Sequence, residues 1–336
     1  MKVAFISYLY PPRSALGGAK IAYKLSKAIE AEGVEVVRIT QNNIDSVHFL
    51  HFAWKARSIA RDCDIAHGST LGDIFIEDTP CVTSLHHPER YNKGSLLRRI
   101  ISKYAEKRCF KKARGVTTLS RRVKDELAEM YGEEEKIDVV HPGVDRVKNP
   151  EEGDVNTILC TAGTGERKGI EYLIEAVSIV NKTNPSIKLR IFGVREEHRE
   201  EIKKTVDKFG VQKNVVALGA IFDEKLDREY RNAGIVAVPS LYEGFGLPII
   251  EGMAYRKPVI TTPVGITQEI VQDKKNAILV EMKSPQSIAN AINSLISNEN
   301  LRGKIAGKGY ETSKDFTWEK SAKKTIEVYN KALELS

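Results

Sequence analysis

Short apolar runs alternate with amphipathic stretches along almost the whole chain. Near the start, residues 2–7 form an apolar run of strand length, and 18–31 carry apolar residues at helical spacing. The same pattern predicts further strands at 34–39, 65–67, 81–85, 115–119, 157–161, 188–192, 215–218, 235–238, 258–261 and 277–280, and further helices near 95–112, 120–131, 169–182, 196–209, 223–233, 248–256, 285–297 and 317–334. Such alternation predicts parallel sheets covered by helices on both faces.

A polar stretch at 145–154, with a proline and a glycine, separates two series of this kind and is typical of a linker. The chain has 336 residues, which is more than one ordinary hydrophobic core needs. The sequence therefore predicts an α/β protein made of two doubly wound, Rossmann-like parallel-sheet domains that face each other across a cleft. We expect them at 1–147 and 154–314, with a terminal helix at 315–336.

Two glutamates flank a glycine-bearing turn after the predicted strand at 235–238. They are Glu243 and Glu251, with Gly246 between them and Pro248 at the expected first position of a helix. In an open α/β sheet this turn lies at the carboxyl edge, where ligands bind, and a helix start favours an anion. One interpretation is a site for a phosphorylated sugar, with amides for phosphate and carboxylates for hydroxyls. The alternative is an ordinary helix start with acids near its positive end.

Two cations, Arg167 and Lys168, follow a glycine-containing turn after the predicted strand at 157–161. Arginine can bind a diphosphate through two parallel hydrogen bonds, and lysine adds a compact charge. The turn is not a P-loop, because Lys168 precedes its glycine and no Ser or Thr follows. The plainer alternative is a pair of solvated cations at a turn.

Other candidates lie at strand ends in the first half. Gly17 and Gly18 come just before a helical pattern, where glycine lets a ligand approach the backbone, although such pairs are usually only turns. His86 follows the predicted strand at 81–85, and a neutral imidazole there could hydrogen-bond a sugar hydroxyl; a lone histidine is more often structural.

The string from Pro239 to Pro248, together with the Glu243–Glu251 spacing, resembles the signature of retaining glycosyltransferase family 4, the group 1 glycosyl transferases of GT-B fold. The order of Gly17-Gly18, the segment 137–145, Arg167-Lys168 and the glutamate motif agrees, so the resemblance covers nearly all of the chain. It implies transfer of a hexosyl unit from a nucleoside-diphosphate sugar to an acceptor hydroxyl with retention of configuration. It also implies that the terminal helix packs back on the first domain.

The resemblance further implies a role for each candidate. His86, Lys168 and Glu243 would be catalytic. Glu243 would contact the hexose, Glu251 the ribose, and Gly193 would lie near the nucleotide base. The amides of 245–247 would bind sugar and phosphate. Together the substrate contacts would come from Gly17, Gly18, Arg167, Lys168, Gly193, Glu243, Phe245, Gly246, Leu247 and Glu251. Many members place their arginine where this chain has Gly163, so Arg167 is the substitute.

No metal or other cofactor is expected. Asp62-Cys63-Asp64 looks like the Asp-x-Asp metal motif of other glycosyltransferases, but it comes at the end of what we take for a polar helix and before a strand, and GT-B members of this type work without a metal. Four scattered cysteines without a Cys-x-x-Cys pair fit a reducing, cytoplasmic setting. No stretch approaches the ~20 apolar residues of a membrane span, and the first residues resemble a strand and not a signal peptide.

The net charge of +7 is unevenly distributed. Residues 90–124 contain thirteen Lys or Arg and one acid, Glu106, so this segment carries +12 and the rest of the chain −5. Apolar residues interleave at near-helical spacing, which predicts an amphipathic basic helix. Its partner could be an anionic membrane surface, a nucleic acid or an anionic soluble substrate, or it could be a solvated face with no partner. An anionic membrane at the inner face and a solvated face without a partner both stay open, and nucleic acid is not expected.

Two other functions remain open from sequence. A nucleotide-sugar epimerase of the same fold would convert a donor without any acceptor. A non-catalytic protein could bind membrane or nucleic acid through 90–124, although intact Lys168, Glu243 and Glu251 argue against it. The expected partners of the transferase are a nucleotide sugar and a glycan, lipid-linked or small-molecule acceptor.

Overall fold

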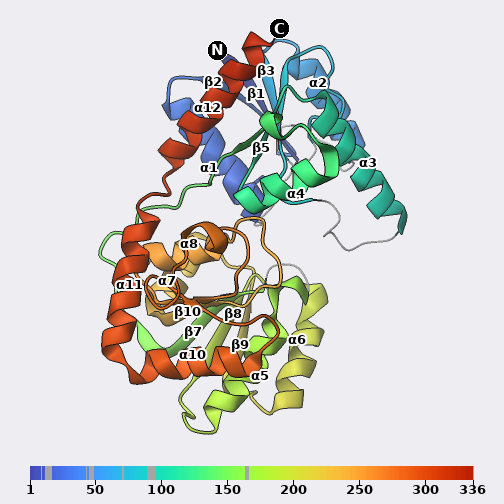
Figure 1. Ribbon diagram of the computed structural model, residues 1–336. Coiled ribbons are helices and arrows are strands. Elements are labelled where there is room, and N and C mark those ends of the chain that lie inside the picture. The colour runs from blue at the N-terminus through green and yellow to red at the C-terminus, as the bar shows by residue number, and fades with distance from the viewer. Residues whose placement is uncertain are drawn as a thin grey trace. The chain divides into compact units, whose positions relative to one another are not determined.

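The computed structural model describes residues 1–8, 10–11, 17–42, 44, 49–69, 72–88, 96–162 and 166–335. The chain divides into two compact units (Figure 1). Unit 1 contains Met1–Gly143 and Thr317–Ser336, and unit 2 contains Val144–Phe316. Unit 1 thus breaks off four residues before the expected 147, and unit 2 begins ten residues before the expected 154 and ends two residues after the expected 314. No helix of the described residues is long and apolar enough to cross a membrane.

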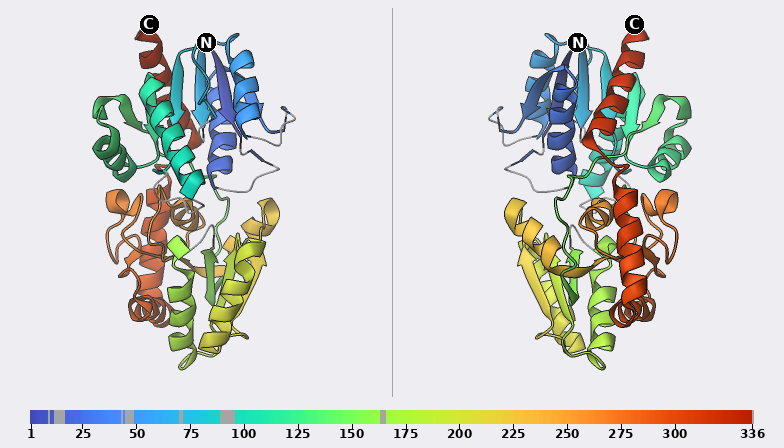
Figure 2. Two further views of the ribbon diagram at one scale, coloured as in Figure 1. Left: turned by 90° about the vertical axis from the view of Figure 1, so that its right-hand side faces the viewer. Right: turned by 90° about the vertical axis from the view of Figure 1, so that its left-hand side faces the viewer.

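Unit 1 contains a six-stranded parallel sheet in the order β2-β1-β3-β4-β5-β6. The strands are β1 (Lys2–Ser7), β2 (Glu35–Thr40), β3 (Ile65–Ser69), β4 (Cys81–Ser84), β5 (Gly115–Thr118) and β6 (Ile137–Val139). The helices are α1 (Gly17–Ala31), α2 (Phe49–Ala60), α3 (Leu96–Lys112), α4 (Arg121–Tyr131) and α12 (Trp318–Glu334). Figure 2 shows helices on both faces of the sheet, as parallel strands with buried faces require.

The terminal helix α12 packs against α1 and covers β4 and β5 (Figure 1). Val328, Tyr329 and Ala332 are buried in the same cluster as the β1 residues Val3 and Phe5. Unit 1 is therefore discontinuous in sequence, since its last helix comes from the far end of the chain.

Unit 2 contains a second six-stranded parallel sheet, in the order β12-β11-β10-β7-β8-β9. The strands are β7 (Asp154–Thr161), β8 (Lys188–Phe192), β9 (Val215–Gly219), β10 (Ala233–Val238), β11 (Val259–Thr261) and β12 (Ile278–Leu279). The helices are α5 (Ile170–Asn181), α6 (Glu196–Phe209), α7 (Asp223–Asn232), α8 (Leu247–Ala254), α9 (Thr267–Ile270), α10 (Pro285–Ser297) and α11 (Glu299–Ser313).

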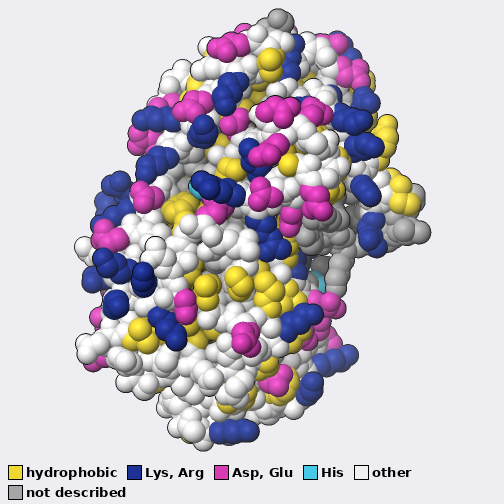
Figure 3. All heavy atoms as spheres, viewed as in Figure 1, with side chains coloured by type: hydrophobic (Ala, Val, Ile, Leu, Met, Phe, Trp, Pro, Cys, Tyr) yellow, Lys and Arg dark blue, Asp and Glu magenta, His cyan; other side chains and the backbone are white. Residues whose placement is uncertain are grey.

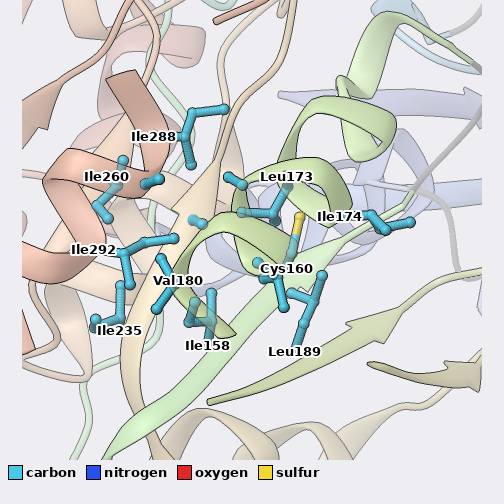
Figure 4. Packing of buried hydrophobic residues seen from close by; sticks show 14 of the residues in the cluster. Ile158, Cys160, Leu173, Ile174, Val180, Leu189, Ile235, Ile260, Ile288 and Ile292 are labelled. Carbon is cyan, nitrogen blue, oxygen red and sulfur yellow. The ribbon is translucent and has the colours of Figure 1, made fainter. Parts of the chain in front are cut away.

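The core of unit 2 forms where α5 and α10 pack on the central strands. Figure 4 shows Val180 of α5 and Ile292 of α10 beside Ile158 of β7, and Leu173 of α5 near Cys160 of β7; Ile288 of α10 belongs to the same cluster. These residues are 0–1% exposed, so this cluster removes a large apolar area from water at ~25 cal/mol per Å². A rigid sheet then carries the loops that follow its strands.

The structure corrects the sequence interpretation in three places. The helix before Asp62 is not polar, because α2 buries Phe52, Ala53 and Ala56. β6 was not predicted as a strand, and α11 was not predicted as a helix. The basic segment 90–124 is not one helix: its described part contains α3, β5 and the first turn of α4.

Candidate active site

The order of strands in unit 2 reverses between β7 and β10, which lie side by side in the sheet. The chain leaves β7 toward one edge of the sheet and leaves β10 toward the other. At such a switch point the loops after the two strands separate and leave a crevice at the carboxyl edge. The loop after β7 leads to Lys168, and the loop after β10 leads to Glu243.

Lys168 and Glu243 form a buried ion pair at this point. The Lys168 Nζ lies 2.6 Å from Glu243 Oε1, and the side chains are 9% and 8% exposed. The Ser240 hydroxyl donates to the same carboxylate oxygen at 2.7 Å. Burial alone would raise the pKa of Glu243, but the charges of Lys168 and Arg167 and the two hydrogen bonds outweigh burial and lower it. Glu243 is therefore a carboxylate at neutral pH.

The local backbone fixes Lys168 in this place. Lys168 ends a 3₁₀ turn, Glu166–Lys168, and is followed by Gly169 in the left-handed region at φ 64°. A Cβ on Gly169 would lie only 2.1 Å from the carbonyl oxygen of Pro239, so no other residue fits without a backbone shift. The Leu241 N–H donates to the Arg167 carbonyl at 2.7 Å and joins the two loops. Gly163, where other members carry arginine, lies outside the described residues.

The turn before α8 follows β10 and so lies at the carboxyl edge of the unit 2 sheet. Gly246 has φ 100° at the N-cap of α8 and no side chain caps the helix start, so the partial positive charge there is not neutralised by a cap. Phe245 is buried and packs on Phe316 at 6.0 Å, while Leu247 is half-buried. Gly265, at φ 55°, approaches so closely that an added Cβ would lie 2.4 Å from the Phe245 carbonyl oxygen.

Glu251 occupies a separate position on α8. Its Oε2 accepts a hydrogen bond of 2.8 Å from the Tyr230 hydroxyl, and both side chains are buried. The Tyr230 ring stacks on Tyr255 at 4.7 Å, and the Tyr255 hydroxyl donates to Asp227. Burial first, and then the negative charge of Glu251, raises the pKa of Tyr230 well above its ordinary value, so Tyr230 stays a donor. The two glutamates of the motif thus have different partners.

Gly193 follows β8, the next strand beside β7, and so lies at the same carboxyl edge. It has φ 74°, and its N–H donates to the Gly219 carbonyl at 2.6 Å. The position is compatible with close approach of a ligand to the backbone.

Unit 1 brings its own candidates together. Gly18 in the first turn of α1 lies so near His86 that an added Cβ would be 3.5 Å from the imidazole Nδ1; Gly17 begins the same turn. His86 is half-buried, and burial, followed by the neighbouring His87, lowers its pKa to about 4. His86 is therefore a neutral imidazole at neutral pH.

The Asp62-Cys63-Asp64 segment lies at the opposite, amino edge of the unit 1 sheet, just before β3. Asp64 Oδ2 accepts a hydrogen bond of 2.7 Å from the backbone N–H of Lys2, which gives this carboxylate a structural contact. In the part of the chain that the structure describes, no group of three or more His, Cys, Asp or Glu side chains is arranged to hold a metal ion.

Two site residues were missed from sequence. Ser240 lies three residues before Glu243, and a hydroxyl at that spacing in a turn is a signal that could have been noticed. Tyr230 gave no signal, because it lies in a polar helix twenty-one residues from Glu251.

Comparison with known proteins supports the fold and identifies the family. The family described as Glycosyl transferases group 1 matches residues 144–312, and the one described as Glycosyltransferase Family 4 matches 16–148. The chain is 27% identical to an uncharacterized glycosyltransferase of Methanocaldococcus jannaschii, over 100% of this chain and 99% of the relative.

Two solved structures share the architecture. Sucrose-phosphate synthase from Thermosynechococcus elongatus superimposes with a TM-score of 0.83 at 20% identity, over 100% of both chains. HepE from Anabaena, in complex with UDP and glucose, has a TM-score of 0.78 at 18% identity, over 98% of this chain and 99% of its own. These likenesses establish the two-domain, Rossmann-like GT-B fold. The chain therefore belongs to the group 1 glycosyl transferases, with a Glycosyltransferase Family 4 match in its first half.

Proposed function

We propose that the chain transfers a hexosyl unit from a nucleoside-diphosphate sugar to an acceptor hydroxyl, with retention of configuration and without a metal ion. The observation that carries this proposal is the buried Lys168–Glu243 pair at the switch point of unit 2. It puts a cation and a carboxylate where the diphosphate and the sugar of such a donor would lie side by side.

The protein's main task in this reaction is to stabilise the departing diphosphate. The bond between the anomeric carbon and the phosphate oxygen breaks, and negative charge develops on the phosphate. Lys168 and Arg167 would neutralise that charge, which is the task a divalent ion performs in other transferases. The uncapped N-terminus of α8 adds the partial positive charge of the helix dipole.

The acceptor oxygen would form its bond on the face that the phosphate leaves. Its proton would pass to the departing phosphate oxygen, so no protein base is needed and the configuration is retained. Glu243, ionised because its pKa is lowered, would accept hydrogen bonds from hexose hydroxyls. His86 stays neutral and could hydrogen-bond a sugar hydroxyl.

The rest of the donor would be bound by the turn and by α8. Glu251, held by Tyr230, would accept the ribose hydroxyls, and Gly193 would lie near the base. Backbone amides of 245–247 would donate hydrogen bonds to the sugar and the phosphate. Gly17 and Gly18 would contact either a donor phosphate or the acceptor. A uridine nucleotide is the first donor to test, because HepE binds UDP. The acceptor would be a glycan, a lipid-linked or a small molecule.

We also propose a cytoplasmic location with reversible docking on an anionic membrane. All four cysteines are free thiols, three of them buried, which suits a reducing compartment. The outer side of α3 exposes Ile100, Ile101 and Tyr104 at 57%, 53% and 66%. Figure 3 shows hydrophobic and basic side chains side by side where Figure 1 labels α3. The one acid of this helix, Glu106, is buried and accepts a hydrogen bond from Tyr131, so it does not offset the outward cations.

Vesicle flotation tests the docking. An Ile100→Ser/Ile101→Ser variant should bind vesicles of phosphatidylglycerol more weakly than the wild type, since apolar insertion and charge act together. A Val216→Ser/Phe222→Ser variant removes two residues of similar exposure, 45% and 46%, from unit 2 and serves as the control. Equal binding of phosphatidylglycerol and phosphatidylcholine vesicles by the wild type would contradict electrostatic docking.

The transfer reaction is tested with UDP-, GDP- and ADP-sugars, first by thermal shift and then by product analysis. A Lys168→Ala variant should lose about 10²–10³-fold in kcat, as when one donor to a developing anion is removed. Lys203→Ala, an exposed cation on α6, is the matched control and should keep full turnover. Near-normal turnover in Lys168→Ala would refute the proposed donor site. Conversion of a donor without any acceptor would indicate an epimerase instead.

A further inference from the structure

Unit 1 contains a cavity of about 600 Å³ between α3 and the segment that leads into β4. Its lining includes five cationic side chains, and we call it the basic cavity. They are Lys107, Arg108, Lys111, Lys112 and Arg114. The volume is within the ~300–1,000 Å³ range of small-molecule sites.

The basic cavity lies at the other edge of the sheet from the candidate active site residues of unit 1. It is lined by Cys81, the first residue of β4, and by Arg114, which directly precedes β5. His86 follows the opposite end of β4. A strand of four residues spans roughly 13 Å, so the basic cavity is separate from the sheet edge at which His86 lies.

Both carboxylates in the lining already have guanidinium partners, from Arg57 and Arg61 outside the cavity and from Arg108 within its lining. Asp78 accepts hydrogen bonds from Arg57 and Arg61 at 2.9 and 2.8 Å, and these two guanidinium groups lower its pKa. Glu77 accepts a hydrogen bond of 2.5 Å from Arg108. The remaining cations of the lining are thus not balanced by these acids.

Lys112 and Arg114 are used by the fold. The Lys112 ammonium donates to the carbonyls of Asp73 and Ile76, and Arg114 donates to the Ala332 carbonyl at 3.2 Å. These bonds hold the cavity walls together and keep two positive charges fixed beside it.

Lys107 and Lys111 do not make structural hydrogen bonds of this kind through their ammonium groups. They are exposed, one helical turn apart, and among the described residues neither ammonium has a hydrogen-bond acceptor or an ion-pair partner. Like charges at this spacing destabilise a helix by ~0.2–0.5 kcal/mol. An anion between the two ammonium groups would remove that repulsion and would make charge-assisted hydrogen bonds.

We propose that the basic cavity binds a ligand that carries a phosphate group, held by Lys107 and Lys111 with the field of Lys112 and Arg114 behind them. The phosphate is compact, doubly charged and rich in acceptor oxygens, and so it suits two adjacent ammonium groups. The phosphate can belong to a soluble compound or to the headgroup of an anionic lipid. The site does not depend on the proposed transfer reaction.

The test compares two double variants that remove the same charge from the same helix. Lys107→Gln/Lys111→Gln removes the unpaired cations of the cavity. Arg99→Gln/Lys103→Gln removes two exposed cations of α3 that do not line it. Binding of inorganic pyrophosphate and of glycerol phosphate is measured by calorimetry, and binding of phosphatidylglycerol vesicles by flotation. Any binding at the donor site is common to all three proteins and cancels in the comparison.

A drop of about tenfold or more in affinity for a soluble phosphate in the cavity variant alone supports the proposal and identifies a soluble ligand. A selective loss of vesicle binding in that variant, without soluble binding, supports it and identifies a lipid headgroup. The proposal fails if all three proteins bind soluble phosphates alike and both variants lose vesicle binding to the same extent. It also fails if the wild type binds neither probe. Sugar transfer in the cavity variant, measured in solution, should stay normal, so a failed transfer reaction is recognised separately.

Discussion

Removing the carboxylate of Glu243 should destabilise unit 2 strongly, quite apart from any effect on catalysis. In a Glu243→Ala variant the Lys168 ammonium, 9% exposed, loses the one ion-pair partner that it has among the described residues, and the Ser240 hydroxyl loses its acceptor. Breaking a buried ion pair by deleting one partner costs about 3–5 kcal/mol. Glu243→Gln keeps an acceptor oxygen for both donors, so its loss of stability should be smaller.

The assay has to distinguish the two units. Both tryptophans, Trp54 and Trp318, lie in unit 1, so urea unfolding followed by tryptophan fluorescence reports on that unit and serves as the internal control. Hydrogen exchange of peptides from 154–262 reports on unit 2. A loss of 3–5 kcal/mol there corresponds to opening that is about two to four orders of magnitude more frequent.

The effect should depend on pH in a defined direction. The folded-state pKa of Glu243 lies below its ordinary value of 4.5, so its contribution to stability is fully present above pH 4.5. It disappears as the pH falls through the lowered folded-state pKa. A nucleoside diphosphate should stabilise Glu243→Ala more than the wild type, because it supplies the missing negative charge to Lys168 without competition. Exchange in Glu243→Ala within tenfold of the wild type at pH 7 would refute the reasoning.

Three further predictions follow from the described contacts. Gly169→Ala should lower the free energy of unfolding of unit 2, measured by hydrogen exchange, by at least about 3 kcal/mol, because the added Cβ collides with a backbone carbonyl. Gly210→Ala, at a similar positive φ but in open space, should lower it by only about 1 kcal/mol, and equal losses in the two variants would contradict this prediction. Tyr230→Phe should raise the KM for the donor several-fold with little change in kcat, since Tyr230 only holds Glu251; a loss confined to kcat would argue against it. Burial lowers the pKa of His67 to about 3, so between pH 3 and 6.5 only the unfolded state binds the proton, and the stability of unit 1 should rise with pH over that range. In tryptophan-monitored urea unfolding, His67→Gln should show a smaller increase of stability with pH than the wild type, and an unchanged increase would contradict the assignment.

Most strands were predictable because each is a short apolar run with a turn after it. β1 and β8 were predicted with their bounds as observed: β1 is a nearly continuous buried run, and β8 alternates buried Leu189 and Ile191 with less buried residues. β6 was missed because it has only three residues and one of them is Asp138. α11 was missed because its sequence has no clear apolar stripe and contains three glycines. Its packing on α8 and α10 holds it in place.

The position of the site at the carboxyl edge of the sheet was predictable from local sequence. Lys168 and Glu243 each follow an apolar run, so both belong to a carboxyl edge. The two residues are seventy-five positions apart in sequence, and their direct contact depends on β7 and β10 lying side by side. That neighbourhood follows from the sheet order and not from any local pattern. The partner of Glu251 was unpredictable for the same reason, because Tyr230 comes from a helix on another part of the chain.

The return of α12 to unit 1 has a consequence for synthesis. Unit 2 is one continuous stretch and can complete itself while the polypeptide is still being made. Unit 1 has to wait for Thr317–Ser336 to emerge from the ribosome, because only then does the Tyr329 hydroxyl reach His67 and Val328 cover Gly115. Until that moment a nascent chain exposes an unfinished sheet, so termination of synthesis before Thr317 would damage unit 1 more than the loss of a single surface helix would suggest.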